Sequence, residues 1–395
     1  MIMKAFLISL LKKFYFLYAL YYYTFSYILQ LLGLIIKANK KEILFVCYGG
    51  RKYGDNVKPI YDFMLKDDRF KDWSFVWAFR KPQEYNIIDN KRTKCCKIDS
   101  VKYYIHALRS KCWITNVTVQ RGLNFKNKGT FYVNTWHGVP LKRIGLDIPK
   151  GAAFRVLNGK EDFDLLCAMG DYDANVYKSA FGVDETKIAV TGYPRNDVLN
   201  ENNIKAAKER LSKYYDIDYS KKIILYAPTY RDYNKEKDGA FSFDYRLSTS
   251  KFLNKLGNNY QLLVRAHGAI EKKDSNTECL EVTTYPCVED LLLITDILVT
   301  DYSGIMFDFA NLNRTIICFA YDLEKYQSTR GMYVDLNEFI PFKLCYNEDD
   351  LYSYITNIDY NKSKQEIIEL ISKCGLICKN AAQNVVNEIY RRIEK

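Results

Sequence analysis

Short apolar runs rich in β-branched and aromatic residues alternate with helix-like stretches along the first half of the chain. The runs fall at residues 42–48, 73–79, 111–117, 130–136, 163–169 and 187–192. Stretches with helical periodicity lie between several of them, for example at residues 101–110 and 173–182. Strands that alternate with helices favour a parallel sheet with both faces covered, so we expect an α/β fold.

The same alternation restarts after a polar helical stretch at residues 203–217. Apolar runs follow at 221–228, 261–266, 279–284, 296–300 and 315–320, and an amphipathic helix closes the chain at 380–395. We therefore predict two doubly wound, Rossmann-like domains, residues 41–200 and 201–395, the second including the closing helix. Such sheets bind ligands beyond the carboxyl ends of their strands, so we expect the two domains to face a shared cleft.

Residues 1–40 differ from the rest and are predicted to form a membrane-associated helical segment. Residues 14–36 are 23 positions without a charge, and as a helix they would extend about 35 Å. Nine of the 23 are Phe or Tyr, which favours a helix lying in the membrane surface over one that spans it. A helix packed on the protein's own core is the alternative. The segment is a poor signal peptide, because its apolar part is too long and no small-residue cleavage site follows.

The net charge and the cysteine spacing argue against nucleic acid, a metal ion and disulfide bonds. The net charge is +11, but the first 41 residues carry six lysines and no acid, so the remaining charge is too dilute for a nucleic-acid groove. The eleven cysteines form no metal-binding or disulfide pattern. We expect buried thiols in a reducing compartment, with no bound metal and no cofactor.

Four stretches that could carry chemistry follow predicted strands. They are WHGVPLK, YAPTYRD, RAHG and TDYSGIMFDF, and in facing domains all four would reach one cleft. In the last of them, Asp301 or Ser303 can cap a helix that starts near Gly304. A helix start beside a glycine suits a phosphate group, although an ordinary capped helix explains the same pattern.

Two of the three histidines occupy matching positions, each beside a glycine at a strand end. His137 is followed by Gly138, Lys142 and Arg143, the last two being cations for an anionic substrate. His267 follows Arg265, which can fork onto phosphate oxygens. His106 lies in a helix-like stretch and is expected to be structural. The chain has no P-loop, GxGxxG or GxSxG motif, and nothing in it requires a metal.

Together, WHGVPLKRIG, GYPRND, YAPTYRD, RAHG and TDYSGIMFDFANLNRTIICFAYDLEKY…RG resemble the CDP-glycerol glycerophosphotransferase family. That family comprises wall teichoic acid primases and polymerases and their relatives in capsule synthesis. The resemblance runs from about Ile43 to Pro341 and implies a GT-B fold. It also implies attachment to the cytoplasmic face of the cell membrane and transfer of glycerol phosphate from CDP-glycerol, with release of CMP.

The resemblance also assigns roles to residues. His137 would be the general base and His267 a second catalytic histidine. Donor binding would fall to Thr229, Arg231, Arg265, Asp301, Ser303 and Gly304, and the acceptor side to Gly138, Lys142, Arg143 and Arg195. Tyr230, Gly268 and Gln327 depart from residues common in the family, so CDP-ribitol or another activated alcohol remains an alternative donor.

Three requirements of such a transfer agree with these residues: alignment of the substrates, a proton acceptor, and positive charge where CMP departs. A lipid-linked saccharide or polyol-phosphate acceptor would explain the membrane-associated segment. Two other functions remain open. One is a nucleotide-sugar glycosyltransferase on the same fold, and the other is a membrane-bound scaffold without activity.

Overall fold

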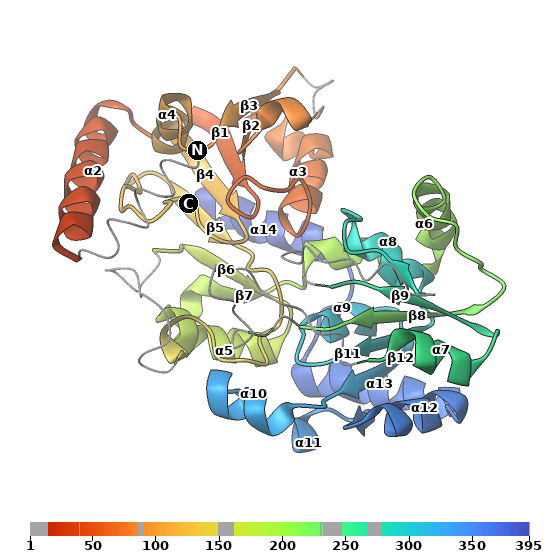
Figure 1. Ribbon diagram of the computed structural model, residues 1–395. Coiled ribbons are helices and arrows are strands. Elements are labelled where there is room, and N and C mark those ends of the chain that lie inside the picture. The colour runs from red at the N-terminus through yellow and green to blue at the C-terminus, as the bar shows by residue number, and fades with distance from the viewer. Residues whose placement is uncertain are drawn as a thin grey trace.

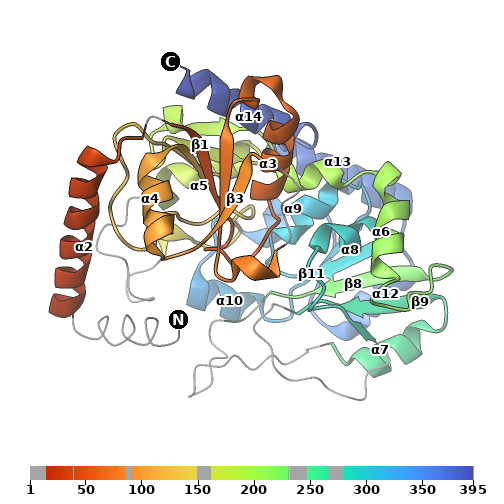
Figure 2. The ribbon, with the colours of Figure 1, turned by 90° about the horizontal axis from the view of Figure 1, so that it is seen from above.

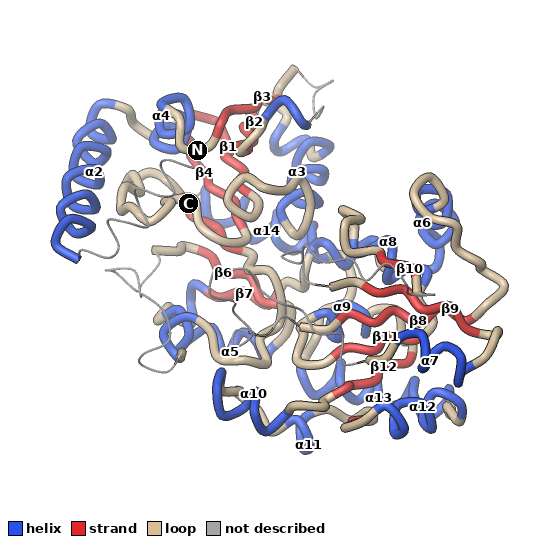
Figure 3. The backbone as a smooth tube through the Cα atoms, viewed as in Figure 1, coloured by secondary structure: helices blue, strands red, loops and turns tan. Residues whose placement is uncertain are grey.

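Two parallel sheets form the framework of the computed structural model, which describes residues 15–38, 40–85, 91–148, 162–229, 231, 247–266 and 279–394 (Figures 1 and 3). The first sheet has the strand order β3-β2-β1-β4-β5-β6-β7. Its strands are β1 (Lys40–Val46), β2 (Ser74–Phe79), β3 (Thr93–Lys97), β4 (Ser110–Thr115), β5 (Phe131–Asn134), β6 (Leu165–Ala168) and β7 (Ile188–Val190).

The second sheet repeats this winding with the order β10-β9-β8-β11-β12-β13. In both sheets the first strand in sequence sits third, and the order reverses beside it, as in doubly wound nucleotide-binding folds. The strands are β8 (Lys222–Ala227), β9 (Tyr260–Val264), β10 (Leu280–Glu281), β11 (Ile297–Thr300), β12 (Thr315–Phe319) and β13 (Leu344–Cys345). The predicted α/β class with two doubly wound sheets is confirmed.

Helices cover both faces of each sheet. Successive side chains of a strand point to opposite faces, and in these strands the side chains on both faces are apolar. In β1, Ile43 and Phe45 pack beneath α3 (Val57–Lys66), whereas Leu44 and Val46 pack beneath α4 (Val101–Arg109). The same core extends to α5 (Asp171–Phe181), which covers β6 and β7. Full burial of both strand faces explains why these runs are apolar throughout. All eleven cysteines are free thiols and seven of them are buried in these cores, as expected.

Helices cover the second sheet in the same way. One face packs against α6 (Ile204–Leu211), α8 (Val288–Ile294), α9 (Ile305–Ala310) and α13 (Tyr360–Cys374). The other face packs against α7 (Thr249–Leu256) and α12 (Glu348–Thr356). Two short helices, α10 (Leu323–Arg330) and α11 (Leu336–Phe339), follow β12. Below, each sheet with its helices is called the N-terminal or the C-terminal half.

The closing helix does not lie where the sequence placed it. Helix α14 (Ala381–Ile393) packs Val385, Val386 and Ile389 into the core beneath β1 and beside α3, in the N-terminal half. Figures 1 and 2 show it crossing back to the first sheet. The predicted unit 201–395 therefore loses its last helix, because the apolar stripe of α14 fits the face that α3 leaves open. The boundary near residue 200 stays a prediction.

Helix α2 (Tyr15–Ile35) lies at the edge of the N-terminal half beside α4 (Figure 2). One stripe, Tyr18, Tyr22, Ser26 and Leu29, is buried, and the Ser26 hydroxyl accepts a hydrogen bond from the Asn124 backbone at 2.9 Å. In the described part of the chain, no helix has the length and apolarity needed to cross a bilayer. The packed stripe matches the alternative that the sequence left open, whereas membrane association stays a prediction.

A buried carboxylate ties β1 to α4 at the start of the first sheet. Glu42 accepts hydrogen bonds from Arg109 Nε at 3.0 Å and Ser110 Oγ at 3.0 Å, and His106 Nδ1 lies 3.0 Å away. Burial opposes ionisation of Glu42, but hydrogen bonds from His106 and Arg109 outweigh it and hold its pKa at about 2. His106 therefore has a structural partner, as expected from its helical setting.

We expect Glu42→Gln to reduce stability in a pH-dependent way. The folded pKa of Glu42 is depressed from 4.5 to about 2, so its stabilisation is present above pH 4.5 and is lost as the pH falls toward 2. Urea unfolding at pH 7 should show a loss of about 3 kcal/mol, shrinking toward zero near pH 2. Glu84→Gln, which alters an exposed ion pair with Lys81, is the control and should change little. An equal loss at both pH values would contradict this account.

Candidate active site

His137 lies in a tight turn immediately after β5. The residue before it, Trp136, has a φ of 49°, in the left-handed region that bulky residues rarely adopt. The Trp136 backbone N–H donates to the Asn134 side chain at 2.6 Å, which holds the turn at the end of the strand. A strained, hydrogen-bonded turn of this kind fixes the direction in which His137 projects.

The hydrogen bonds of His137 define its tautomer. Its Nδ1 lies 2.9 Å from the backbone oxygen of Asn116. A carbonyl oxygen can only accept, so Nδ1 carries the proton and Nε2 carries the lone pair. Burial lowers the pKa of His137 below its usual value, opposed by the Asn116 hydrogen bond and by Asp55. The imidazole is therefore neutral near pH 7 and able to accept a proton through Nε2.

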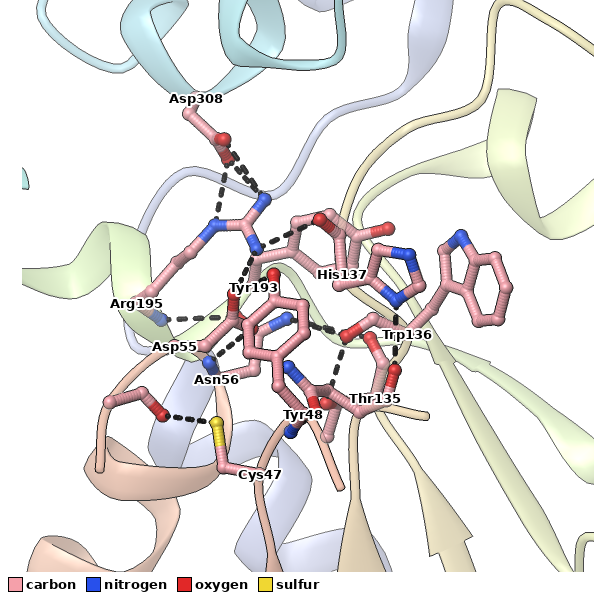
Figure 4. A network of polar contacts seen from close by, with 12 residues as sticks. Cys47, Tyr48, Asp55, Asn56, Thr135, Trp136, His137, Tyr193, Arg195 and Asp308 are labelled. Atoms are coloured by element: carbon pink, nitrogen blue, oxygen red, sulfur yellow. Dashed lines mark hydrogen bonds and ion pairs between the residues drawn. The ribbon is translucent and has the colours of Figure 1, made fainter. Parts of the chain in front are cut away.

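Arg195 occupies the centre of a polar network beside His137 (Figure 4). It comes from the turn η5 (Pro194–Val198), within the GYPRND motif. Its Nη1 lies 3.0 Å from Asp55 Oδ2, and its Nη2 lies 2.9 Å from Asp308 Oδ2. Attraction to Asp308 and Asp55 outweighs burial and raises the pKa of Arg195. Asp55 belongs to the N-terminal half and Asp308 to α9, so the network joins the two halves.

The WHG and DYSG stretches meet directly, as the sequence predicted for loops at facing strand ends. A Cβ placed on Gly304 would lie 2.9 Å from the Val139 oxygen and 3.2 Å from the Val139 nitrogen. Glycine is needed there because of this close approach, since its φ is an ordinary −61°. Around Gly138, by contrast, a Cβ would meet no described atom within 4 Å.

Thr229, Arg231 and Asp301 form a second polar cluster, in the C-terminal half. The Thr229 backbone and hydroxyl both donate to Asp301, and Arg231 pairs with Asp301 at 2.8 Å and with Asp322 at 2.8 Å. The YAPTYRD and TDYSG motifs thus come together, as predicted. Asp301 does not cap α9, however. The cap residue is Gly304, and only Ser303 approaches the helix, its Oγ 3.4 Å from the Ile305 nitrogen.

Arg265 follows β9, as expected, and turns toward the loop before α8. Its Nη1 donates to the backbone oxygens of Val282 at 3.1 Å and Tyr285 at 2.8 Å. Burial lowers its pKa, and Glu289 is the main charge that opposes this effect. His267 and Tyr230 lie outside the described residues. The convergence of two histidines on one substrate therefore stays a prediction.

Lys142 and Arg143 lie where the two halves touch a second time. Lys142 forms an antiparallel bridge with Met332, and the Arg143 backbone donates to the Gly331 oxygen at 3.1 Å. Tyr333 completes the contact, its hydroxyl donating to Asp147 at 2.7 Å. Lys142 and Arg143 follow His137 in the sequence, and both lie at the contact between the two halves. Their role on the acceptor side remains a prediction.

Several residues of this site were not predicted from the sequence. Asp55 and Asn56 come from the glycine-bearing loop after β1, which was notable in the sequence only for lacking a P-loop pattern. Asp308 lies inside TDYSGIMFDF but was not assigned a role. A signal existed, because the loop after β1 sits where the strand order reverses, and such points form sites. Among the described residues, no group of three His, Cys, Asp or Glu side chains could hold a metal ion.

Two doubly wound sheets whose loops meet around a histidine and an interdomain arginine define a GT-B-like two-domain protein. The family of CDP-Glycerol:Poly(glycerophosphate) glycerophosphotransferases matches residues 28–395, and the chain belongs to it. The resemblance inferred from the motifs is thereby confirmed.

Individual relatives agree with this assignment. The chain is 32% identical over 375 residues to the teichoic acid glycerol-phosphate transferase of Staphylococcus aureus, covering 89% of this chain and 94% of that protein. It is 31% identical to the teichoic acid poly(glycerol phosphate) polymerase of Staphylococcus epidermidis, but spans only about half of that protein, 51%. The wall teichoic acid polymerase TagF, solved as a variant soaked with CDPG, superposes with a TM-score of 0.80 at 29% identity, covering 92% of each chain.

The contact between Gly304 and Val139 can be tested by adding one methyl group. We expect Gly304→Ala to destabilise the protein by about 1–3 kcal/mol, because a Cβ would overlap the backbone of the opposite half. Gly54→Ala is the control, since no described atom lies within 4 Å of its added Cβ. Thermal unfolding should give a lower melting temperature for Gly304→Ala than for Gly54→Ala. Equal melting temperatures would show that the two halves do not touch here.

Proposed function

We propose that the protein transfers glycerol phosphate from CDP-glycerol to a hydroxyl of a membrane-linked acceptor in the synthesis of teichoic acid or a related polymer. The observation that carries this proposal is the neutral, Nδ1-protonated imidazole of His137 in a chain of this family, because the backbone that follows it, at Gly138 and Val139, lies against Gly304 of the donor-side motif TDYSG. A base in that tautomer and at that junction suits the removal of a proton from an attacking hydroxyl.

The reaction would proceed by one displacement. The acceptor oxygen attacks the β-phosphorus of CDP-glycerol, its proton passes to Nε2 of His137, and the bond from that phosphorus to CMP breaks. CMP leaves with the electron pair and one added negative charge. The imidazolium then returns the proton to solvent or to the departing phosphate. Alignment of the two substrates supplies several kcal/mol of the lowered barrier.

The donor would lie on the C-terminal half. Ser303 and Gly304 are partly exposed where α9 begins, and Arg265 follows β9, which β8 separates from β11. Thr229, Arg231 and Asp301 are already bonded to one another, so we assign them to shaping the donor site from behind. Arg265, with His267 as predicted from sequence, would then meet the diphosphate.

The acceptor would lie on the N-terminal half, beside Gly138, whose surroundings are open in the described structure. Lys142 and Arg143 follow on the same loop and would attract a phosphate-bearing acceptor. We further propose that the protein works at the cytoplasmic face of the cell membrane and reaches a lipid-linked acceptor there.

Helix α2 supports membrane attachment. Its outward side exposes large apolar residues along its whole length, with Phe16 76%, Leu34 71% and Ile35 80% exposed. Exposed lysines follow at Lys37, Lys40 and Lys41, where they would meet anionic headgroups. A helix fixed to the protein on one side and apolar on the other is typical of attachment in the membrane surface.

A donor panel tests the reaction. The protein should release CMP from CDP-glycerol in the presence of an acceptor, more slowly from CDP-ribitol, and should release no UDP from UDP-sugars. His137→Gln should lower the rate by about 10²–10⁴-fold, because the general base is lost. His106→Gln, which alters a histidine bound to Glu42, is the matched control and should keep the rate. UDP release from a UDP-sugar would instead establish a glycosyltransferase.

Membrane attachment can be tested on the exposed side of α2 alone. The triple variant Leu20→Gln, Tyr27→Gln, Leu34→Gln keeps the buried stripe and should reduce sedimentation with phosphatidylglycerol vesicles by about tenfold or more. Ile368→Gln removes a comparably exposed apolar side chain from α13 and should leave sedimentation unchanged. If the triple variant sediments like the unaltered protein, α2 does not attach it.

A further inference from the structure

Arg195 is a buried cation held from two sides. Its side chain is 7% exposed, and the carboxylates of Asp55 and Asp308 are each 10% exposed. Its Nε and Nη2 both face Asp308 Oδ1, at 3.3 Å and 3.1 Å, while Nη1 faces Asp55. Two carboxylates around one guanidinium use its planar fork fully, so the group has little capacity left to bind a substrate anion.

The same guanidinium reaches the turn that carries His137. Arg195 Nη1 also donates to the backbone oxygen of His137 at 3.1 Å. Through its own N–H, Arg195 donates to Asn56 Oδ1 at 3.2 Å. Asn56 Nδ2 in turn lies 3.4 Å from the Thr135 oxygen and 3.3 Å from the Trp136 oxygen. Three consecutive residues of the strained turn are therefore held by Arg195 or by its partner (Figure 4).

On its far side the network holds the donor half. Asp308 lies in α9, one turn after Gly304, and it also accepts a hydrogen bond from Asn196 Nδ2 at 2.9 Å. Arg195 and Asn196 are neighbours in GYPRND, so two adjacent residues of the N-terminal half bind one carboxylate of the C-terminal half. Among the described contacts, the ion pair of Arg195 with Asp308 is the one that links the His137 turn to α9 through charged side chains.

We propose that Arg195 is a positioning residue of the transfer reaction, which sets the His137 turn at a fixed distance and angle from the start of α9. The sequence placed Arg195 on the acceptor side as a substrate cation, whereas its contacts assign it an action through His137. The inference rests on the proposed function, in which His137 is the base and α9 begins beside the donor. A misplacement of about 1 Å between such groups can cost roughly 10²-fold in rate.

The charged groups of the network also affect the pKa of His137. Three charged groups act on it, Asp55 raising its pKa and Arg195 and Lys142 lowering it, in addition to the dominant effect of burial. The side chains packed around it are the rings of Tyr48 and Trp136, which carry no charge at neutral pH. Loss of Arg195 should therefore raise the pKa of His137, and loss of the Asp55 charge should lower it.

The first test measures kinetics. Arg195→Lys keeps the charge but loses the fork, so kcat for CMP release should fall by about 10²-fold while the KM for CDP-glycerol changes less than about twofold. Arg109→Lys is the matched control, because Arg109 also forks onto a buried carboxylate, Glu42, at the opposite end of β1. It should lower the melting temperature without lowering kcat.

The second test does not depend on activity. Histidine-selective NMR titration of the full chain should show the pKa of His137 raised in Arg195→Gln and lowered in Asp55→Asn. Where Arg195→Gln does not fold, Asp308→Asn keeps the shape of the network, and its kcat should fall as in Arg195→Lys.

The outcomes are distinguishable. Unchanged kcat in Arg195→Lys, or an equal loss of kcat in Arg109→Lys, would overturn the positioning role. A His137 pKa that stays the same in both NMR variants would do so as well. If the unaltered protein releases no CMP from CDP-glycerol, the proposed function fails, and the titration still decides whether Arg195 acts on His137.

Discussion

The guanidinium of Arg195 lies between a carboxylate from each half of the chain, Asp55 and Asp308, and is shielded from water. Taking three charges out of water costs free energy, so such a cluster adds little to stability compared with apolar packing. The cluster instead fixes the orientation of its members, because the planar guanidinium pairs with both carboxylates only in a defined geometry. Removing Arg195 would leave two buried carboxylates without their cation, at a cost of about 3–5 kcal/mol. The relative placement of the two halves depends on this constraint.

The chemistry of the site follows from that placement. His137 is held by its neighbours rather than by its own side chain alone: Asn116 fixes the tautomer, and Arg195 with Asn56 fixes the backbone of the turn. Arg231 is likewise paired, with Asp301 and Asp322. Two of the arginines that resembled substrate ligands in the sequence, Arg195 and Arg231, are thus paired with carboxylates inside the protein. Arg265, which follows β9, is also bonded within the protein, to the backbone oxygens of Val282 and Tyr285.

Helix α2 has two sides with different surroundings. Its Tyr18, Tyr22, Ser26 and Leu29 stripe is packed on the protein, and its other side presents apolar side chains outward. A helix that is apolar all round needs a partner on every side. The protein supplies one partner along the stripe, and the partner proposed for the other side is a membrane surface.

Local patterns in the chain were enough to predict the fold class, the two sheets and the loops that carry the motifs, because apolar alternation and strand-end glycines are short-range signals. They also predicted that the YAPTYRD and TDYSG loops meet, and they identified the family. The return of α14 to the first sheet emerged only from packing across the folded chain, where its apolar stripe joins the core beneath β1. Asp55 and Asp308 are likewise far apart in the sequence, and folding brings both to Arg195. Which charged side chains pair depends on how the whole chain folds, and a local sequence pattern contains no information about such distances.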